Sequence, residues 1–428
     1  MSRYQESEEW LIQSEITIPL GSQTFSKSRT QYPVGISPLY AAKAKGPFIW
    51  DIDNNKYIDL VNGLGAVTLG YGNTCVKRAI KKQLKKGITL SLPGKLEAIV
   101  AEKIVEIIPS AEQVRFFKNG SDATSAAIRL ARAYTGKDHI LVCGYHGWQD
   151  WSISTTSRNK GIPKEVQSLS HRFTYNDIDS LLDLTKLYEK NIAAIILEPI
   201  NSETPKDFFL ENVQKISQKI GAVLIFDETV TGFRISLGGA QEYFNVTPDL
   251  STFGKGIANG MPLSAVVGKK EIMLEFENVF LSGTFGGELL SLAAANAVID
   301  MYKQIGVSST LHDYGAKLST QISLLTEQIG LEKIFSLSGH PSWMFLNWKS
   351  TTEYSVDQLK TYFMQEMFNE GVLILGTHNV SLAHDEKIMN KTINAYEKVF
   401  LNMKNNIDRN ELREKTSVEP NVPLFTIR

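Results

Sequence analysis

The stretch Phe253-Gly-Lys-Gly-Ile-Ala258 holds one lysine, Lys255, between small residues, directly after a run over residues 249–253 that predicts a β-strand. A lysine in a tight apolar turn at the end of a strand is partly removed from water. Burial disfavours the charged ammonium form, so we expect Lys255 to present a free amine more readily than a surface lysine does. Such an amine attacks carbonyl carbons and forms Schiff bases.

A carboxylate follows a second apolar run upstream of this lysine. Residues 222–226 predict another strand, and Asp227 comes directly after it. An aspartate near a Schiff-base lysine is placed to hold a protonated pyridine nitrogen, which is the pairing of a pyridoxal 5′-phosphate (PLP) site. The alternative interpretation is that Lys255 lies in an ordinary loop and that Asp227 is a solvated carboxylate at a strand end.

The composition is that of a globular protein with more than one lobe. The chain has 428 residues, of which 43% are hydrophobic and 21% charged. A formal net charge of −1 gives no electrostatic reason to expect nucleic acid or a membrane as partner. Two cysteines are too few for a disulfide framework or a Cys-based zinc site, and we expect no metal. The polar, acidic N-terminus and the lack of a long apolar run predict a cytoplasmic protein.

From residue 114 onward the sequence alternates between strand and helix patterns, which predicts an α/β fold. Continuous β-branched runs between helices indicate a mostly parallel central sheet with helices on both faces. Mixed patterns after residue 304 predict a smaller α+β domain. The expected domains are an N-terminal segment that is part of the small domain, a large PLP-binding domain and a C-terminal small domain, over residues 1–60, 61–304 and 305–428.

Two loops that precede helices are candidates for binding phosphate. Gly120 and Ser121 join a strand over residues 114–117 to a helix over residues 122–135. A glycine allows close approach of the backbone, and a helix N-terminus presents free N–H groups and a favourable dipole to an anion. The alternative is an ordinary helix cap. Thr284 lies in the second such loop, before an alanine-rich helix over residues 289–304.

Further candidate site residues also follow predicted strands. Tyr145 and His146 come after the strand over residues 139–143, where Tyr145 is suited to stack on a flat ring; the alternative is a turn whose aromatic side chains fill the rim of the core. Ligands of open α/β sheets gather at the carboxyl ends of the strands. We therefore expect five residues to converge on one edge of the sheet: Gly120, Tyr145, Glu198, Asp227 and Lys255.

Longer motifs around these positions resemble the class-III aminotransferases, which are PLP-dependent enzymes of fold type I. The matching stretches are Asp227-Glu-Thr-Val-Thr-Gly-Phe-Arg234, Leu237-Gly-Gly-Ala-Gln241, Thr247-Pro-Asp-Leu250, Tyr145-His-Gly147 and residues 115–136. The likeness covers roughly residues 10 to 400 and is greatest to glutamate-1-semialdehyde aminomutase. It implies a homodimer with its active site at the subunit interface.

The resemblance also implies roles for single residues. Lys255 is the Schiff-base lysine and the general base, and Asp227 holds the pyridine nitrogen. Tyr145, with His146 beside it, stacks on one face of the ring. The remaining cofactor contacts implied by the resemblance are Thr229 on the other face, Glu198 near the ring oxygen, Gly120 and Ser121 at the phosphate, and Thr284 from the partner subunit.

Segments that face the substrate in the aminomutase are different in this chain. They comprise residues 23–33, 152–163, 283–288 and 376–381, the last of which lacks the glutamate of the aminomutase. We therefore predict a ping-pong aminotransferase, and analogy alone points to carbohydrate or secondary biosynthesis as its setting. The alternatives are an aminomutase and a non-catalytic PLP-binding protein. The candidate substrate contacts, each with packing or surface exposure as the alternative, are Arg29, Trp148, Trp151 and His378.

Overall fold

The computed structural model describes residues 3–422, which form two compact units. The larger unit spans residues 74–309, and the smaller unit combines residues 3–73 with residues 310–422. The domain boundaries expected after residues 60 and 304 stay a prediction. Within residues 3–422 no helix is long and apolar enough to cross a membrane.

The larger unit is built on a seven-stranded sheet with the strand order β4-β10-β9-β8-β7-β5-β6. Five neighbouring strands, from β9 to β6, run parallel, whereas β10 is antiparallel to both β9 and β4. The mostly parallel sheet is therefore confirmed. Its strands are β4 (Gln113–Phe117), β5 (His139–Cys143), β6 (Ser170–Arg172), β7 (Ile192–Leu197), β8 (Val223–Glu228), β9 (Leu250–Phe253) and β10 (Ser264–Gly268).

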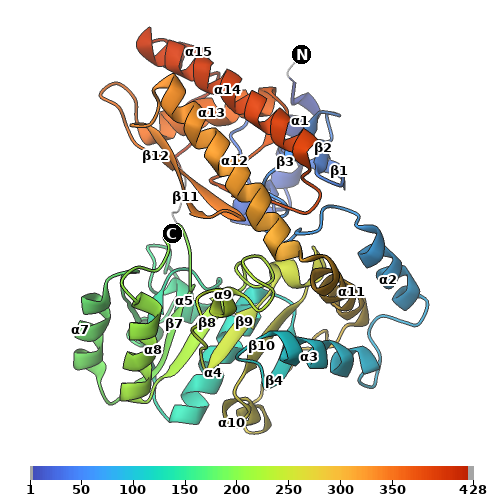
Figure 1. Cartoon of the computed structure of the whole chain (residues 1–428), viewed down its shortest axis with the longest axis vertical. Helices are drawn as coiled ribbons and strands as arrows, with labels where there is room; N and C mark the ends of the chain where they lie inside the picture. The colour runs from blue at the N-terminus through green and yellow to red at the C-terminus, as the bar shows by residue number, and fades with distance from the viewer. Residues whose placement is uncertain (1–2, 423–428) are drawn as a thin grey trace. The chain divides into compact units, whose positions relative to one another are not determined.

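Helices cover both faces of this sheet because alternate strand residues point to opposite sides. Ile140 and Val142 of β5 pack in one core cluster with the small residues of α4 (Gly120–Thr135). Leu141, between them, packs in a second cluster with α7 (Ile178–Tyr188) and α8 (Phe209–Ile220). Figure 1 shows α7 and α8 side by side. Burial of the central strands on both faces explains their continuous apolar sequences.

The other helical segments of the larger unit surround this three-layer core. The longest is α11 (Leu289–Ile305), which packs against α2 (Thr74–Leu84) and α3 (Lys95–Ile107). The short segments are α5 (Asp150–Ile153), α6 (Lys164–Gln167), α9 (Ala240–Tyr243), η3 (Lys255–Ala258), α10 (Lys270–Met273) and η4 (Leu274–Glu277).

The smaller unit contains two sheets. In the first, of order β1-β2-β3-β13, the C-terminal strand β13 (Val372–Leu373) pairs in parallel with β3 (Lys56–Asp59). This pairing joins the N-terminal segment to the C-terminal part of the chain. The other strands are β1 (Ala41–Lys45), β2 (Phe48–Asp51), and, in the second sheet, β11 (Phe335–His340), β12 (Trp343–Trp348) and β14 (Thr377–Asn379).

Helices complete the smaller unit. Helices α13 and α14 pack on each other, and α12 carries the chain into this unit from residue 307. The helical segments are α1 (Gln5–Glu15), η1 (Pro19–Gly21), η2 (Phe25–Lys27), α12 (Val307–Ile329), α13 (Val356–Asn369), α14 (Glu386–Asp408) and α15 (Leu412–Lys415).

Candidate active site

Four neighbouring parallel strands bring predicted site residues to one edge of the larger sheet. Cys143 at the end of β5 pairs with Leu197 of β7, and Leu197 pairs with Phe226 of β8. Asp227, the next residue, pairs with Thr252 of β9. The residues at these strand ends and directly after them therefore lie together, as expected for the ligand-binding edge of an open α/β sheet.

Asp227 is the most strongly constrained charge at this edge. It is 5% exposed, and its Oδ1 atom accepts hydrogen bonds from the backbone N–H of Thr229 (3.0 Å) and the hydroxyl of Thr252 (3.1 Å). Its Oδ2 atom lies 2.8 Å from Nδ1 of His146. Burial alone raises the pKa of Asp227, but the hydrogen bonds and the charge of His146, together with Thr229, outweigh burial and hold that pKa at about 2. Asp227 is thus ionised at neutral pH.

His146 is held between two acceptors. Its Nδ1 atom faces the Asp227 carboxylate, and its Nε2 atom lies 3.0 Å from the carbonyl oxygen of Cys143. Both partners are hydrogen-bond acceptors, and together they fix the orientation of the ring. The ring is 2% exposed and stacks parallel to Trp151, with ring centroids 6.2 Å apart. A buried imidazole ring and a buried carboxylate are therefore paired at this edge of the sheet.

The loop between β4 and α4 ends in an anion-binding helix start. Helix α4 begins at Gly120, two residues before the expected start, because Asn119 is its N-cap and the Asp122 carboxylate accepts the backbone N–H of Asn119 (3.0 Å). Gly120 and Ser121 therefore lie in the first turn, where backbone N–H groups have no partner within the helix. This geometry suits a phosphate group.

Glycines let three segments approach this helix start closely. A Cβ atom at Gly120 would lie 2.9 Å from Cγ2 of Thr229, and one at Gly147 would lie 2.4 Å from Cβ of Ser121. Gly147 also has φ +107°, which favours glycine. A Cβ atom at Gly254 would lie 3.1 Å from Cγ2 of Thr229. Any larger side chain at these positions would push the segments apart.

Lys255 follows Gly254 in the chain, and its backbone conformation is strained. It is the first residue of η3, directly after β9, and its φ of +40° is rare for a residue other than glycine. The neighbouring Gly254 lies beside Thr229 and Gly120, so the half-buried Lys255 is placed close to the helix start. Backbone strain of this kind clusters at functional sites, where the surrounding structure enforces it.

The remaining predicted cofactor contacts of the larger unit differ in exposure. Glu198, at the end of β7, is buried, and its Oε2 atom would lie 3.3 Å from a Cβ atom at Gly144. Tyr145 is half-buried and follows Gly144 in the loop after β5. Thr284 is exposed in the segment that precedes α11. Trp148, proposed as a substrate contact, is 65% exposed.

Three other candidates for substrate contact already have structural partners. Trp151 is buried in the core cluster behind His146, and its Nε1 donates to the hydroxyl of Ser125 (2.9 Å). His378 is 0% exposed within the smaller unit, where it bonds to the Tyr396 hydroxyl. Burial lowers the pKa of His378 to about 3, so its ring stays neutral. Trp151 and His378 are thus core residues, and the guanidinium of Arg29 is engaged by Glu15.

Two threonines that support the site were missed by the sequence analysis. Thr252 donates to Asp227, as described above, and the hydroxyl of Thr124 donates to the carbonyl oxygen of His146 (2.6 Å). Both are buried. Thr252 could be found only from the strand register, which pairs it with Asp227, and nothing in its local sequence reveals that register.

The chemistry of this edge suits a flat, doubly charged ligand. The start of α4 favours an anion, the ionised Asp227 favours a cationic group, and Lys255 supplies an amine. The hydroxyl oxygen of Thr229 is buried without a hydrogen-bond partner among the described residues, which marks a place for a ligand atom. Across residues 3–422 no three His, Cys, Asp or Glu side chains gather to hold a metal ion.

Comparisons with known proteins agree with this chemistry. The family described as aminotransferase class-III matches residues 31–392. A glutamate-1-semialdehyde 2,1-aminomutase of Syntrophobacter fumaroxidans is 34% identical over 89% of this chain and 94% of its own. A 3-aminobutyryl-CoA aminotransferase of Cloacimonas acidaminovorans is 34% identical over 84% of this chain and 88% of its own.

A solved structure resembles the whole chain. The FumI protein of Sphingopyxis sp. MTA144, in its PLP internal aldimine form, has a TM-score of 0.88 and 27% sequence identity, with 97% of this chain and 99% of that chain covered. The expected fold type I is confirmed. The unpartnered Thr229 hydroxyl, the close approach at Gly120 and the charges of the site all fit PLP. The chain belongs to the class-III aminotransferase family, whose cofactor is pyridoxal 5′-phosphate.

Proposed function

We propose that this protein is an aminotransferase that moves an amino group from an amino donor to a carbonyl acceptor by a ping-pong mechanism. The observation that carries the proposal is the buried Asp227–His146 pair, which keeps the carboxylate ionised at the sheet edge where Lys255 emerges. A fixed negative charge beside a reactive amine is the arrangement that PLP chemistry requires.

In this proposal Lys255 and Asp227 carry the chemistry of the protein. When bound, PLP supplies a carbonyl that accepts the amino group and a ring that takes up the electron pair of the substrate carbon. Lys255 would hold the cofactor covalently, and its Nζ atom would serve as the base at the substrate carbon. The ionised carboxylate of Asp227 keeps the ring nitrogen protonated, and His146 keeps Asp227 ionised.

The remaining cofactor contacts position the group. The N–H groups of Gly120 and Ser121 would hold the phosphate, and Tyr145 and Thr229 would pack against the ring. Glu198 would contact the side of the ring that carries the oxygen. Thr284 reaches the phosphate of the partner subunit's site, and its exposed position before α11 is consistent with that role.

A second candidate function is an intramolecular aminomutase. It is favoured by the glutamate-1-semialdehyde 2,1-aminomutases, which are 34% identical to this chain. The 3-aminobutyryl-CoA aminotransferase is also 34% identical, so overall identity does not separate the two reactions. The differences at residues 152–163 and 376–381 favour the aminotransferase. A non-catalytic PLP-binding protein is the third alternative.

A screen of half-reactions tests the proposed reaction. We expect the PLP form to lose its visible absorbance when mixed with one member of a panel of amino acids and amino sugars, and to release one equivalent of the matching carbonyl product. Mass spectrometry of the mixture measures that product. Isomerisation of glutamate-1-semialdehyde without an external donor would instead identify a mutase, and a PLP-loaded protein that reacts with no donor would support the non-catalytic alternative.

Replacement of the reactive lysine tests the role of Lys255. We expect Lys255→Ala to abolish covalent attachment of PLP and to lower turnover by at least about 10²- to 10⁴-fold, the contribution of a positioned general base. Absorbance spectra before and after dialysis measure the attachment. The control is Lys270→Ala, an exposed lysine of the same unit, which should leave both readouts unchanged. Normal turnover in Lys255→Ala would overturn the assignment.

Replacement of His146 tests how Asp227 stays ionised. Because the pKa of Asp227 lies at about 2, below its ordinary 3.8, the contribution of the ionised form is complete above pH 3.8 and is lost as pH falls through about 2. In His146→Leu, only the hydrogen bonds from Thr229 and Thr252 still oppose the effect of burial on Asp227, so retention of PLP should fail about one to three pH units higher. Absorbance of bound PLP against pH measures this shift. His139→Gln, at the opposite end of β5, should behave as wild type.

We also propose a cytoplasmic homodimer. Both cysteines are free, which is usual in a reducing compartment. Apolar side chains are exposed on two adjacent segments of the larger unit: Leu90, Leu92, Phe280 and Phe285. The segments meet where the N–H of Leu289 donates to the carbonyl of Ile88 (3.0 Å). Exposed apolar surface of this kind marks a protein interface.

The dimer has its own test in solution. We expect the double variant Leu92→Asp/Phe280→Asp to sediment as a monomer, because two carboxylates would have to be buried in the interface. Analytical ultracentrifugation measures the mass. Phe208→Asp is the matched control, since Phe208 is also exposed, at 75% against 87% for Phe280, but lies before α8. A dimer that persists in the double variant would show that this surface is not the interface.

A further inference from the structure

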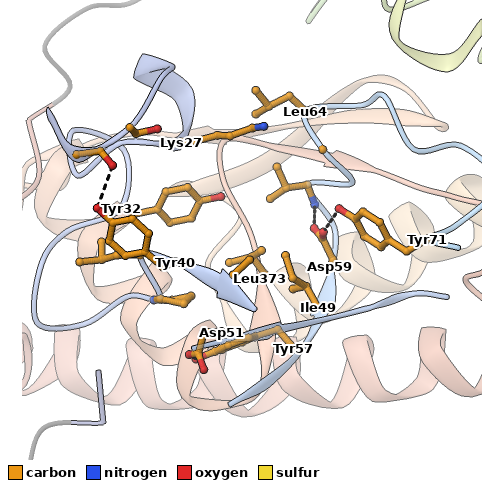
Figure 2. A pocket seen from close by; sticks show the side chains of 17 residues that line it. Lys27, Tyr32, Tyr40, Ile49, Asp51, Tyr57, Asp59, Leu64, Tyr71 and Leu373 are labelled. Carbon is orange, nitrogen blue, oxygen red and sulfur yellow. Dashed lines mark hydrogen bonds between the residues drawn. The ribbon is translucent and has the colours of Figure 1, made fainter. Parts of the chain in front are cut away.

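The smaller unit contains a cavity of its own. It has a volume of about 320 Å³ and lies between residues 21–41 and the sheet formed by β2, β3 and β13. Figure 2 shows the side chains that line it. The volume is in the range of small-molecule sites, and every lining residue belongs to the smaller unit.

The walls of the cavity are mostly apolar. Leu39 and Ile49 line it together with Val61, Leu64 and Leu373. The rings of four tyrosines complete the lining: Tyr32, Tyr40, Tyr57 and Tyr71. A ligand that fills this space therefore needs an apolar body, because burial of apolar surface is the main attraction that such walls offer.

The two carboxylates of the lining are already hydrogen-bonded within the protein. Asp51 accepts the backbone and side-chain amides of Asn55 (2.7 and 2.8 Å) and the hydroxyl of Tyr57 (3.0 Å). Asp59 accepts two backbone N–H groups of the turn that follows it (2.7 and 2.9 Å) and the hydroxyl of Tyr71 (2.6 Å). Both are almost fully buried, so they shape the cavity and are not available for a cationic ligand.

The hydroxyl of Tyr32 is a hydrogen-bond donor that faces the cavity and is available to a ligand. Its hydroxyl points into the space in Figure 2, and among residues 3–422 it has no hydrogen-bond partner. The side chain is 8% exposed. Burial, with a smaller contribution from the charge of Asp59, raises the pKa of Tyr32. Its hydroxyl therefore keeps its proton at neutral pH and can donate to a ligand.

Lys27 presents a second donor, and a positive charge. Its side chain extends along the edge of the cavity in Figure 2, with the ammonium group towards Leu64. Within the described chain this ammonium group forms no ion pair, whereas the nearby Arg29 is engaged by Glu15. The two groups that remain available to a ligand are therefore both donors, and one of them is cationic.

We propose that this cavity binds a small anionic molecule with an apolar body, whose carboxylate or phosphate group is held by Lys27 and Tyr32. A cation would meet Lys27 with no free carboxylate to offset it. A neutral apolar molecule would leave both donors without an acceptor. The proposal concerns binding and does not rest on the transamination reaction, so each can fail without the other.

Ligand-observed NMR titration of the full-length PLP-loaded protein tests this site. The probes are hexanoate, hexyl phosphate and, as the neutral analogue, 1-hexanol. We expect both anions to bind at least about tenfold more tightly than the alcohol, since hydrogen bonds to a charged group are the strong ones. Equal or tighter binding of 1-hexanol would overturn the proposal.

Two single substitutions test which residues contact the bound anion. Lys27→Met removes the charge and keeps the length of the side chain, and Tyr32→Phe removes only the hydroxyl while keeping the ring near Phe368 (centroids 6.3 Å apart). Each should weaken hexanoate binding about tenfold, and Lys27→Met should leave 1-hexanol binding unaffected. Lys45→Met, an exposed lysine of β1 outside the cavity, is the control. Unchanged hexanoate affinity in both variants would refute the assignment.

Inhibition kinetics then distinguish two sources of such a ligand. If the anionic group belongs to the substrate, hexanoate should compete with the amino donor or the carbonyl acceptor and raise KM alone. If the site binds a separate effector, hexanoate should change kcat. In either case Lys27→Met must weaken the effect about tenfold; inhibition that is insensitive to this variant would place the bound anion elsewhere and overturn the proposal.

Discussion

The contact between His146 and Asp227 is the interaction on which the rest of the site depends. A buried carboxylate is costly unless a partner offsets the loss of water. Here the partner is an imidazole ring that is itself fixed by the Cys143 carbonyl and by Trp151. The pair links the ends of β5 and β8, and Thr252 of β9 joins it. One charged contact therefore sets both the electrostatics and the geometry of the sheet edge.

Close backbone packing complements this charge. Gly120, Gly147 and Gly254 bring the start of α4, the loop after β5 and the end of β9 against one another, at distances that leave no room for a Cβ atom at Gly120 or Gly147 and little at Gly254. Lys255 is forced into a positive φ directly after this point. Such a conformation costs of order 1–3 kcal/mol, and the surrounding contacts supply the free energy that maintains it. The position of the amine is thus set by packing around it.

The cavity of the smaller unit has a different kind of lining from the sheet edge of the larger unit. The cavity is mostly apolar, and the two carboxylates that line it, Asp51 and Asp59, are already hydrogen-bonded within the protein. The groups available to a ligand are the phenol of Tyr32 and the ammonium of Lys27. The candidate cofactor edge of the larger unit is built instead on the buried pair of His146 and Asp227. The segment over residues 23–33, which supplies Lys27 and Tyr32, is also one of those that differ from the aminomutase.

The sequence by itself determined the alternation of strands and helices and the class of the sheet, because these depend on local periodicity, and its motifs of fixed spacing led to the proposal that Lys255 and Asp227 hold PLP. It did not determine the start of α4, where the N-cap Asn119 extended the helix to Gly120. The tertiary structure alone decided that His378 is a core residue and that Thr252 donates to Asp227. It alone also revealed the cavity. Burial and strand register arise from contacts between distant segments, and no local pattern in the sequence records them.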